Sequence, residues 1–234
     1  YDAHVGERAS ISAASLEVSA KSNKVSGGVP FEFTGFDSLN LQPLLGQNNY
    51  YTEAIAGGAA EEAAVSGAYA VNYFEDVLTA SIGASTLVES TGNVTIRSEY
   101  DALAKAFTGA VSGAFNTGVG GSHVNVVNKT KIESSISDNA LVVAGSVNVL
   151  ARSRLDVGSF GVSAAGADTA GVVGVTSVIK SENHVKAFIG DDAVVRAGRD
   201  GVGEGDHIVE ATNEHKALTI AGGAAGGSKA GVGA

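Results

Sequence analysis

Five histidines and three pairs of adjacent carboxylates are the residues of this sequence whose types could serve metal binding or acid–base catalysis. They are His4, His123, His184, His207 and His215, with the pairs Glu61-Glu62, Glu75-Asp76 and Asp191-Asp192. The histidines lack the spacing of a metal-ligand set, since no HExxH motif occurs. Two carboxylates can cleave a glycosidic bond when they flank it at a defined separation. Asp191-Asp192 directly follows Gly190 at the end of an apolar run, so we predict a turn there.

Missing residue types exclude several other kinds of site. The sequence contains no cysteine, which rules out disulfide scaffolds, thiol catalysis and cysteine-based zinc sites. The segment 201–206 (GVGEGD) is a single copy with the wrong spacing for the calcium-binding Gly-Asp nonapeptide repeat. We therefore expect no enzyme and no cofactor, and Ca²⁺ binding between turns stays open.

The charge of the chain limits its partners. A net charge of −10 and a pI near 4.9 disfavour nucleic acid and anionic membranes, because no basic stripe is available to neutralise phosphates. No apolar run reaches the 18 residues that a membrane-spanning helix needs. We expect neither nucleic-acid binding nor membrane insertion. The absence of methionine favours an internal fragment of a longer protein.

The elements that position these residues recur along the chain. Ile82, Ile136 and Ile189 align at spacings of 54 and 53 residues, and Val5 takes the same place in the first unit. The last unit aligns if about seven residues are inserted within 199–206, and the first if about 24 are inserted. The sequence is therefore one domain, residues 1–234, made of ~53-residue units. Their approximate bounds are 1–78, 79–132, 133–185 and 186–234.

Apolar residues alternate with polar ones inside each unit, which predicts strands. Short strands in long repeats favour an all-β fold, a right-handed parallel β-helix (β-solenoid) with open ends and about two coils per unit. In such a stack Val5, Ile82, Ile136 and Ile189 form one inward core ladder. The small residues of 107–121 (FTGAVSGAFNTGVGG) then fit a narrow interior where opposite sheets approach closely.

One segment, residues 24–51, breaks the repeat and concentrates aromatic residues and both prolines. Insertions in solenoids emerge as loops, often on the binding side. We predict a loop whose aromatic side chains contact a partner or a sugar: Phe31, Phe33, Phe36, Tyr50 and Tyr51. The alternative is a small satellite core folded over the solenoid.

The repeats, with ASIG, then GNVTIRS, then GAVSGAFNTGVGGS, resemble those of giant secreted bacterial exoproteins of the filamentous-haemagglutinin type. The resemblance implies a secreted or cell-surface rod segment that is structural and adhesive, without catalysis. Its partners would be neighbouring repeats or identical subunits, and a host-surface protein or glycan. Two alternatives stay open: a subunit of a self-assembling extracellular filament, and a carbohydrate-binding or carbohydrate-cleaving β-helix protein.

Overall fold

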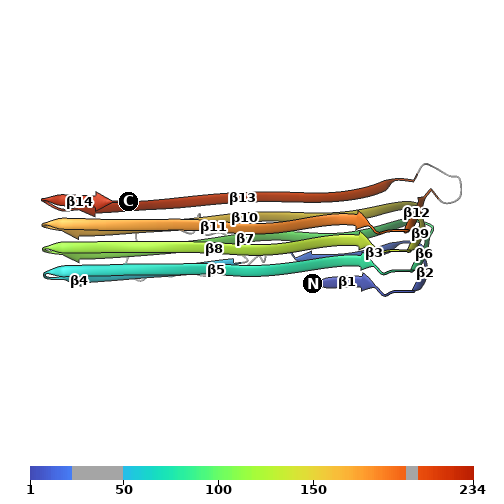
Figure 1. Ribbon diagram of the computed structural model, residues 1–234, viewed down its shortest axis with the longest axis horizontal. Coiled ribbons are helices and arrows are strands. Elements are labelled where there is room, and N and C mark those ends of the chain that lie inside the picture. The colour runs from blue at the N-terminus through green and yellow to red at the C-terminus, as the bar shows by residue number, and fades with distance from the viewer. Residues whose placement is uncertain (23–49, 199–204) are drawn as a thin grey trace.

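The computed structural model describes residues 1–22, 50–198 and 205–234, which form fourteen strands and, in these ranges, no helix. The strands build three parallel sheets (Figure 1). Sheet A has the order β1-β5-β8-β11-β14. Its strands are β1 (Asp2–Val5), β5 (Ala63–Ile82), β8 (Thr117–Ile136), β11 (Ala170–Ile189) and β14 (Ala230–Gly233).

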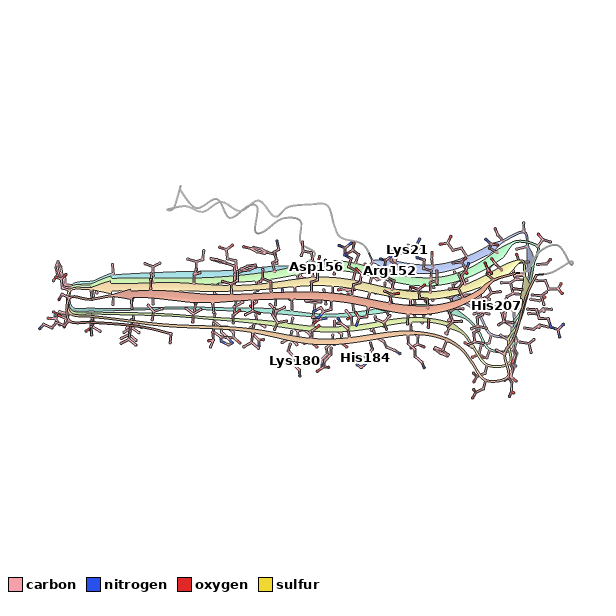
Figure 2. The ribbon with its side chains drawn as sticks, turned by 90° about the horizontal axis from the view of Figure 1, so that it is seen from above. Lys21, Arg152, Asp156, Lys180, His184 and His207 are labelled. Carbon is pink, nitrogen blue, oxygen red and sulfur yellow. The ribbon has the colours of Figure 1, made fainter. Side chains whose placement is uncertain are left out.

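Sheet C lies opposite sheet A, and the short sheet B joins them at one end (Figures 1 and 2). Sheet C has the order β13-β10-β7-β3, with β4 also paired to β7. Its strands are β3 (Leu16–Ser22), β4 (Tyr50–Ala60), β7 (Asn93–Ala114), β10 (Ser146–Ala167) and β13 (His207–Gly226). Sheet B, of order β12-β9-β6-β2, comprises β2 (Ser10–Ala13), β6 (Leu87–Ser90), β9 (Leu141–Ala144) and β12 (Val194–Ala197).

The chain passes through sheets A, B and C in turn and then returns to sheet A. Each strand pairs with the strand one whole unit later: Ile82 with Ile136, Ile136 with Ile189, and Phe107 with Phe160. The expectation of two coils per unit is therefore wrong, because two strands of 20 to 22 residues and one of four fill a single winding. At ~3.3 Å per residue a 20-residue strand spans roughly 66 Å, whereas one winding adds only ~4.8 Å to the stack.

The register also locates the two irregular parts of the repeat. Leu16 pairs with Val94, 78 residues later, whereas Tyr50 pairs with Ala104, only 54 residues later. The extra residues of the first winding thus lie between β3 and β4. The later shift to a spacing of 60 residues, as between Ala170 and Ala230, arises between β12 and β13. Residues 23–49 and 199–204 lie outside the described part of the chain.

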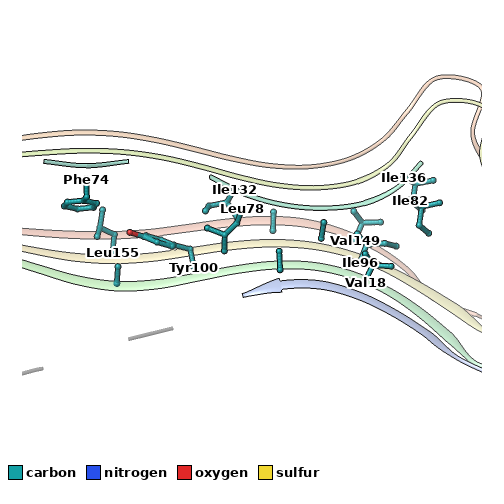
Figure 3. Close-up of a cluster of buried hydrophobic side chains, with 14 of the residues drawn as sticks. Val18, Phe74, Leu78, Ile82, Ile96, Tyr100, Ile132, Ile136, Val149 and Leu155 are labelled. Atoms are coloured by element: carbon teal, nitrogen blue, oxygen red, sulfur yellow. The ribbon is translucent and has the colours of Figure 1, made fainter. Parts of the chain in front are cut away.

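Burial alternates residue by residue along β5, β7, β8, β10 and β11, as the two-residue periodicity predicts, whereas β13 is exposed nearly throughout. The buried face of β7 carries Val94, Ile96 and Ala102 of the hydrophobic core. Figure 3 shows Ile96 packed between sheets A and C. Ile82 and Ile136 lie side by side with no exposed surface (Figure 3). Val5 is partly buried beside them, and Ile189 is 36% exposed because β14 covers only the first four residues of β11.

Small residues let the two large sheets touch at the end farthest from sheet B. A Cβ atom on Gly118 would lie 2.8 Å from the carbonyl oxygen of Gly166, and one on Gly120 would lie 2.9 Å from that of Ala164. Real Cβ atoms essentially never approach backbone so closely, so only glycine fits at these β8 positions. Figure 2 shows the layers running close together there and separating near sheet B. The narrow interior predicted for 107–121 is thus present.

Stacked turns connect sheets A and B. Arg8, Ser85, Asn139 and Asp192 occupy the same place in successive windings with φ of 56° or 57°. Backbone bonds tie each turn to the next, as in Asn139 N–H donating to the Asp191 carbonyl at 3.0 Å. The turn predicted at Asp191-Asp192 is confirmed.

Candidate functional site

A half-buried carboxylate with two phenols lies on the inner faces of sheets A and C. Asp76 on β5 accepts hydrogen bonds at the same Oδ2 atom from Tyr50 of β4, at 2.5 Å, and Tyr100 of β7, at 2.8 Å. Tyr100 is only 1% exposed, and the Tyr50 ring stacks on Phe74 with 4.2 Å between centroids. The neighbouring Glu75 points outward, where Tyr73 donates to it. Strand alternation therefore separates Glu75 from Asp76, and the two cannot act jointly as acid and base.

The polar character of this site continues into the next windings. Asp76, Thr130 and Asn183 are successive Cα partners on sheet A. Asn183 Oδ1 accepts from Thr130 Oγ1 at 2.6 Å and from Asn128 Nδ2 at 2.8 Å. Sequence reasoning missed this seam. The available signal was a polar residue at the same inward position of three aligned units.

Burial sets the protonation state of the two phenols. Desolvation, followed by the hydrogen bond to Asp76, raises the pKa of Tyr100 and Tyr50 well above the usual value near 10. Both hydroxyls therefore stay protonated as donors to Asp76 at neutral pH.

This raised pKa predicts a loss of stability in alkali. A folded-state pKa above the unfolded value gives stability that is complete below pH ~10 and is lost as pH rises further. Above pH ~10, Tyr100 should lower the free energy of unfolding by about 1.4 kcal/mol per pH unit. In Tyr100→Phe, urea unfolding between pH 8 and 11.5 should give a lower starting stability but a flatter alkaline decline. The exposed Tyr69→Phe variant should keep the wild-type slope, and parallel profiles for all three proteins would contradict this assignment.

The residues predicted to form a partner-contact loop divide into two groups. Phe31, Phe33 and Phe36 lie outside the described residues. Tyr50 and Tyr51 are the first residues of β4 and not part of a loop, which corrects the bounds of the insertion. Tyr50 points into the core and is no free contact residue, whereas Tyr51 faces outward and donates to Glu53 at 2.9 Å.

The outer face of sheet A divides into a charged and an uncharged half. Near sheet B, successive windings present Glu75, Lys129 and Glu182 in register, a row of alternating charge. Beyond Tyr73 of β5, toward the far end, the outward positions carry no Asp, Glu, Lys or Arg through 63–73, 117–127 and 170–178. Figure 2 shows Lys180 and His184 projecting from this face, with Lys21, Arg152 and Asp156 on the opposite one.

An aromatic pair marks the uncharged half of sheet A. The Tyr69 and His123 rings stack with 5.2 Å between centroids and 7° between planes. His123 Nδ1 lies 2.9 Å from Thr176 Oγ1 of the next winding. The row of Gly67, Gly121 and Gly174 beside them forms the floor of a shallow groove.

The outer face of sheet C carries an apolar patch at the same end. Phe107, Phe160 and Ile220 are Cα partners in one row, in which the β4 member is Glu53 and Phe160 is only 8% exposed. The next row toward the far end holds Ile55 and Val162. Ile55 and Val162 are each 44% exposed, and Ile220 is 46% exposed. Beyond the row of Glu53 and Phe107, the outer face of sheet C thus offers uncharged contact surface at the end away from sheet B, as sheet A does.

The described residues carry no cluster that suggests metal chemistry. Within 1–22, 50–198 and 205–234 no three His, Asp or Glu side chains gather as metal ligands would. The same ranges hold no helix of the length and apolarity that crossing a bilayer requires. Comparisons with protein-family models, with curated proteins and with solved structures yield no match to this chain.

Proposed function

We propose that this chain is a structural and adhesive segment of a large secreted or cell-surface bacterial protein, wound as a right-handed β-solenoid. The observation that carries the proposal is the continuous parallel register of all three sheets through successive windings, as in Leu87, Leu141 and Val194 of sheet B. Crossovers between parallel strands are right-handed in about 98% of cases, which supports the hand. The repeat pattern, similar to filamentous-haemagglutinin-type exoproteins, supports the location.

The dimensions of one winding favour the role of an adhesive surface over the role of a long spacer. Some 53 residues add only ~4.8 Å to the stack but present two faces roughly 66 Å wide. A protein selected for length alone would gain more from narrow coils. Broad flat faces with uncharged ends, such as the rows of sheet C that expose Ile55, Val111 and Val162, suit contact with a host-surface protein or glycan.

The adhesive role can be tested with two outward substitutions on the same strand. Val162→Lys adds a charge to the uncharged patch of β10, whereas Asn148→Lys adds it to the charged end of the same face. The probes are an immobilised glycan panel and immobilised extracellular-matrix proteins, with binding followed by interferometry. We expect Val162→Lys to weaken binding at least tenfold and Asn148→Lys to leave it unchanged. Wild-type protein that binds no probe, or equal losses in both variants, would refute the adhesive role.

A further inference from the structure

Three glycines stand in one outward row in the interior of the long strands of sheet A. Gly67, Gly121 and Gly174 are successive Cα partners and each is the fifth residue of its strand. Glycine weakens a strand because it loses more backbone entropy than other residues and packs no side chain. Its recurrence at one place in three windings therefore needs a cause.

The fold itself supplies no such cause. A Cβ atom on Gly174 would meet nothing within 4 Å, and on Gly121 or Gly67 its nearest neighbour would lie at 3.7 or 3.9 Å, an ordinary contact. None of the three has a positive φ. The inward glycines differ, since a Cβ on Gly118 or Gly171 would lie 2.8 or 2.6 Å from backbone oxygen. A mid-strand glycine with free space around it is typical of a place where another backbone approaches from outside.

The surroundings of the row define the surface. On one side the outward residues Val65, Val119 and Val172 form a parallel ridge, which Val232 of β14 extends. Val65 is 75% exposed and Val232 is 57% exposed. The uncharged half of sheet A surrounds both rows, so covering it would bury no Asp, Glu, Lys or Arg side chain.

We propose that this face docks onto the same face of a second copy of the chain, the valine ridge of each copy filling the glycine groove of the other. Ridge and groove are adjacent and parallel, so a two-fold axis between them makes both contacts at once. The contact surface spans three to four strands at ~4.8 Å spacing and about eleven residues at ~3.3 Å. Its area is therefore roughly 500–700 Å² per copy. This area lies at the small end of specific interfaces, so the dimer is weak. Inside the molecule, a glycine of β8 already allows the backbone of the opposite sheet to approach closely, as Gly120 does for the backbone of Ala164.

Sedimentation equilibrium of the full chain up to about 300 µM, with thermal melts at low concentration, tests the proposal. Gly121→Val fills the groove, so we expect the dimer to weaken at least tenfold. Because the new side chain has room and valine favours strands, we expect the Tm of the monomer to rise by a few degrees. Gly57→Val is the matched control, since Gly57 lies on the outer face of sheet C, its Cβ would also meet nothing within 4 Å, and its partners in the same row are Val111 and Ala164 and not further glycines. It should leave association unchanged.

Four results would overturn the inference. They are a monomeric wild type at 300 µM, a Gly121→Val variant of lower Tm, dimers that persist unchanged in that variant, and equal loss of association in Gly57→Val. A lower Tm would assign the glycine to the fold. A monomeric wild type whose glycan binding is lost in Gly121→Val would assign the groove to a glycan instead. Loss of binding in Val162→Lys alone concerns sheet C, so it tests the adhesive role separately.

Discussion

Replacing Gly120 by valine should lower the free energy of unfolding by about 3 kcal/mol, one of the two largest effects expected in this chain. A Cβ atom there would lie 2.9 Å from the carbonyl oxygen and 3.5 Å from the carbonyl carbon of Ala164 on the opposite sheet. Backbone cannot rotate away as a flexible side chain can, so sheets A and C would have to separate. Separation would open gaps around Ser112 and Ser122, which pack in the same narrow end.

The adjacent residue provides the control for this prediction. Gly121 points outward with room for a side chain, so Gly121→Val should be neutral or stabilising by up to about 1 kcal/mol. Equilibrium urea unfolding of both variants at low protein concentration measures the difference. Similar destabilisation of the two would show that strand propensity, not the contact between the sheets, decides the cost.

Much of the fold could be predicted from the sequence because one rule, two-residue alternation, governs nearly every strand. The ladder of Ile82, Ile136 and Ile189 follows from spacing alone, and the structure pairs these residues. The number of coils per unit could not be predicted. In a narrow core the buried positions are often polar or small, as at Ser98, Thr108 and Gly161, and this composition is also typical of turns. Strands of 20 to 22 residues therefore look like several strands of ordinary length.

The interior polar site was less accessible to sequence reasoning for a different reason. Tyr50 follows an irregular, aromatic segment and so was assigned to it by composition. Its place on β4 depends on pairing with Ala104, more than fifty residues later. Its role depends on Asp76 and Tyr100, which reach it from two other strands. A single sequence carries no local signal for such a three-strand contact.

Truncating Ile136 to alanine should cost about 3–4 kcal/mol, the other large effect expected. Ile136 is fully buried in the middle of the ladder, with Ile82 on one side and Ile189 on the other. Removing three carbons there leaves a cavity that two neighbouring windings border, and the strands cannot close it without losing their register. Since each winding is stabilised only by its neighbours, weakening a central one weakens two interfaces.

Ile189→Ala makes the same truncation at the equivalent position of the next winding, where the side chain is 36% exposed. Less surface is buried and only one neighbour borders the gap, so the cost should be about 1 kcal/mol. Urea unfolding of the two variants, followed by circular dichroism, compares them directly. A stack stabilised by one continuous inward ladder requires the central truncation to cost clearly more. Equal losses would mean that the ladder is not the element that holds the windings together.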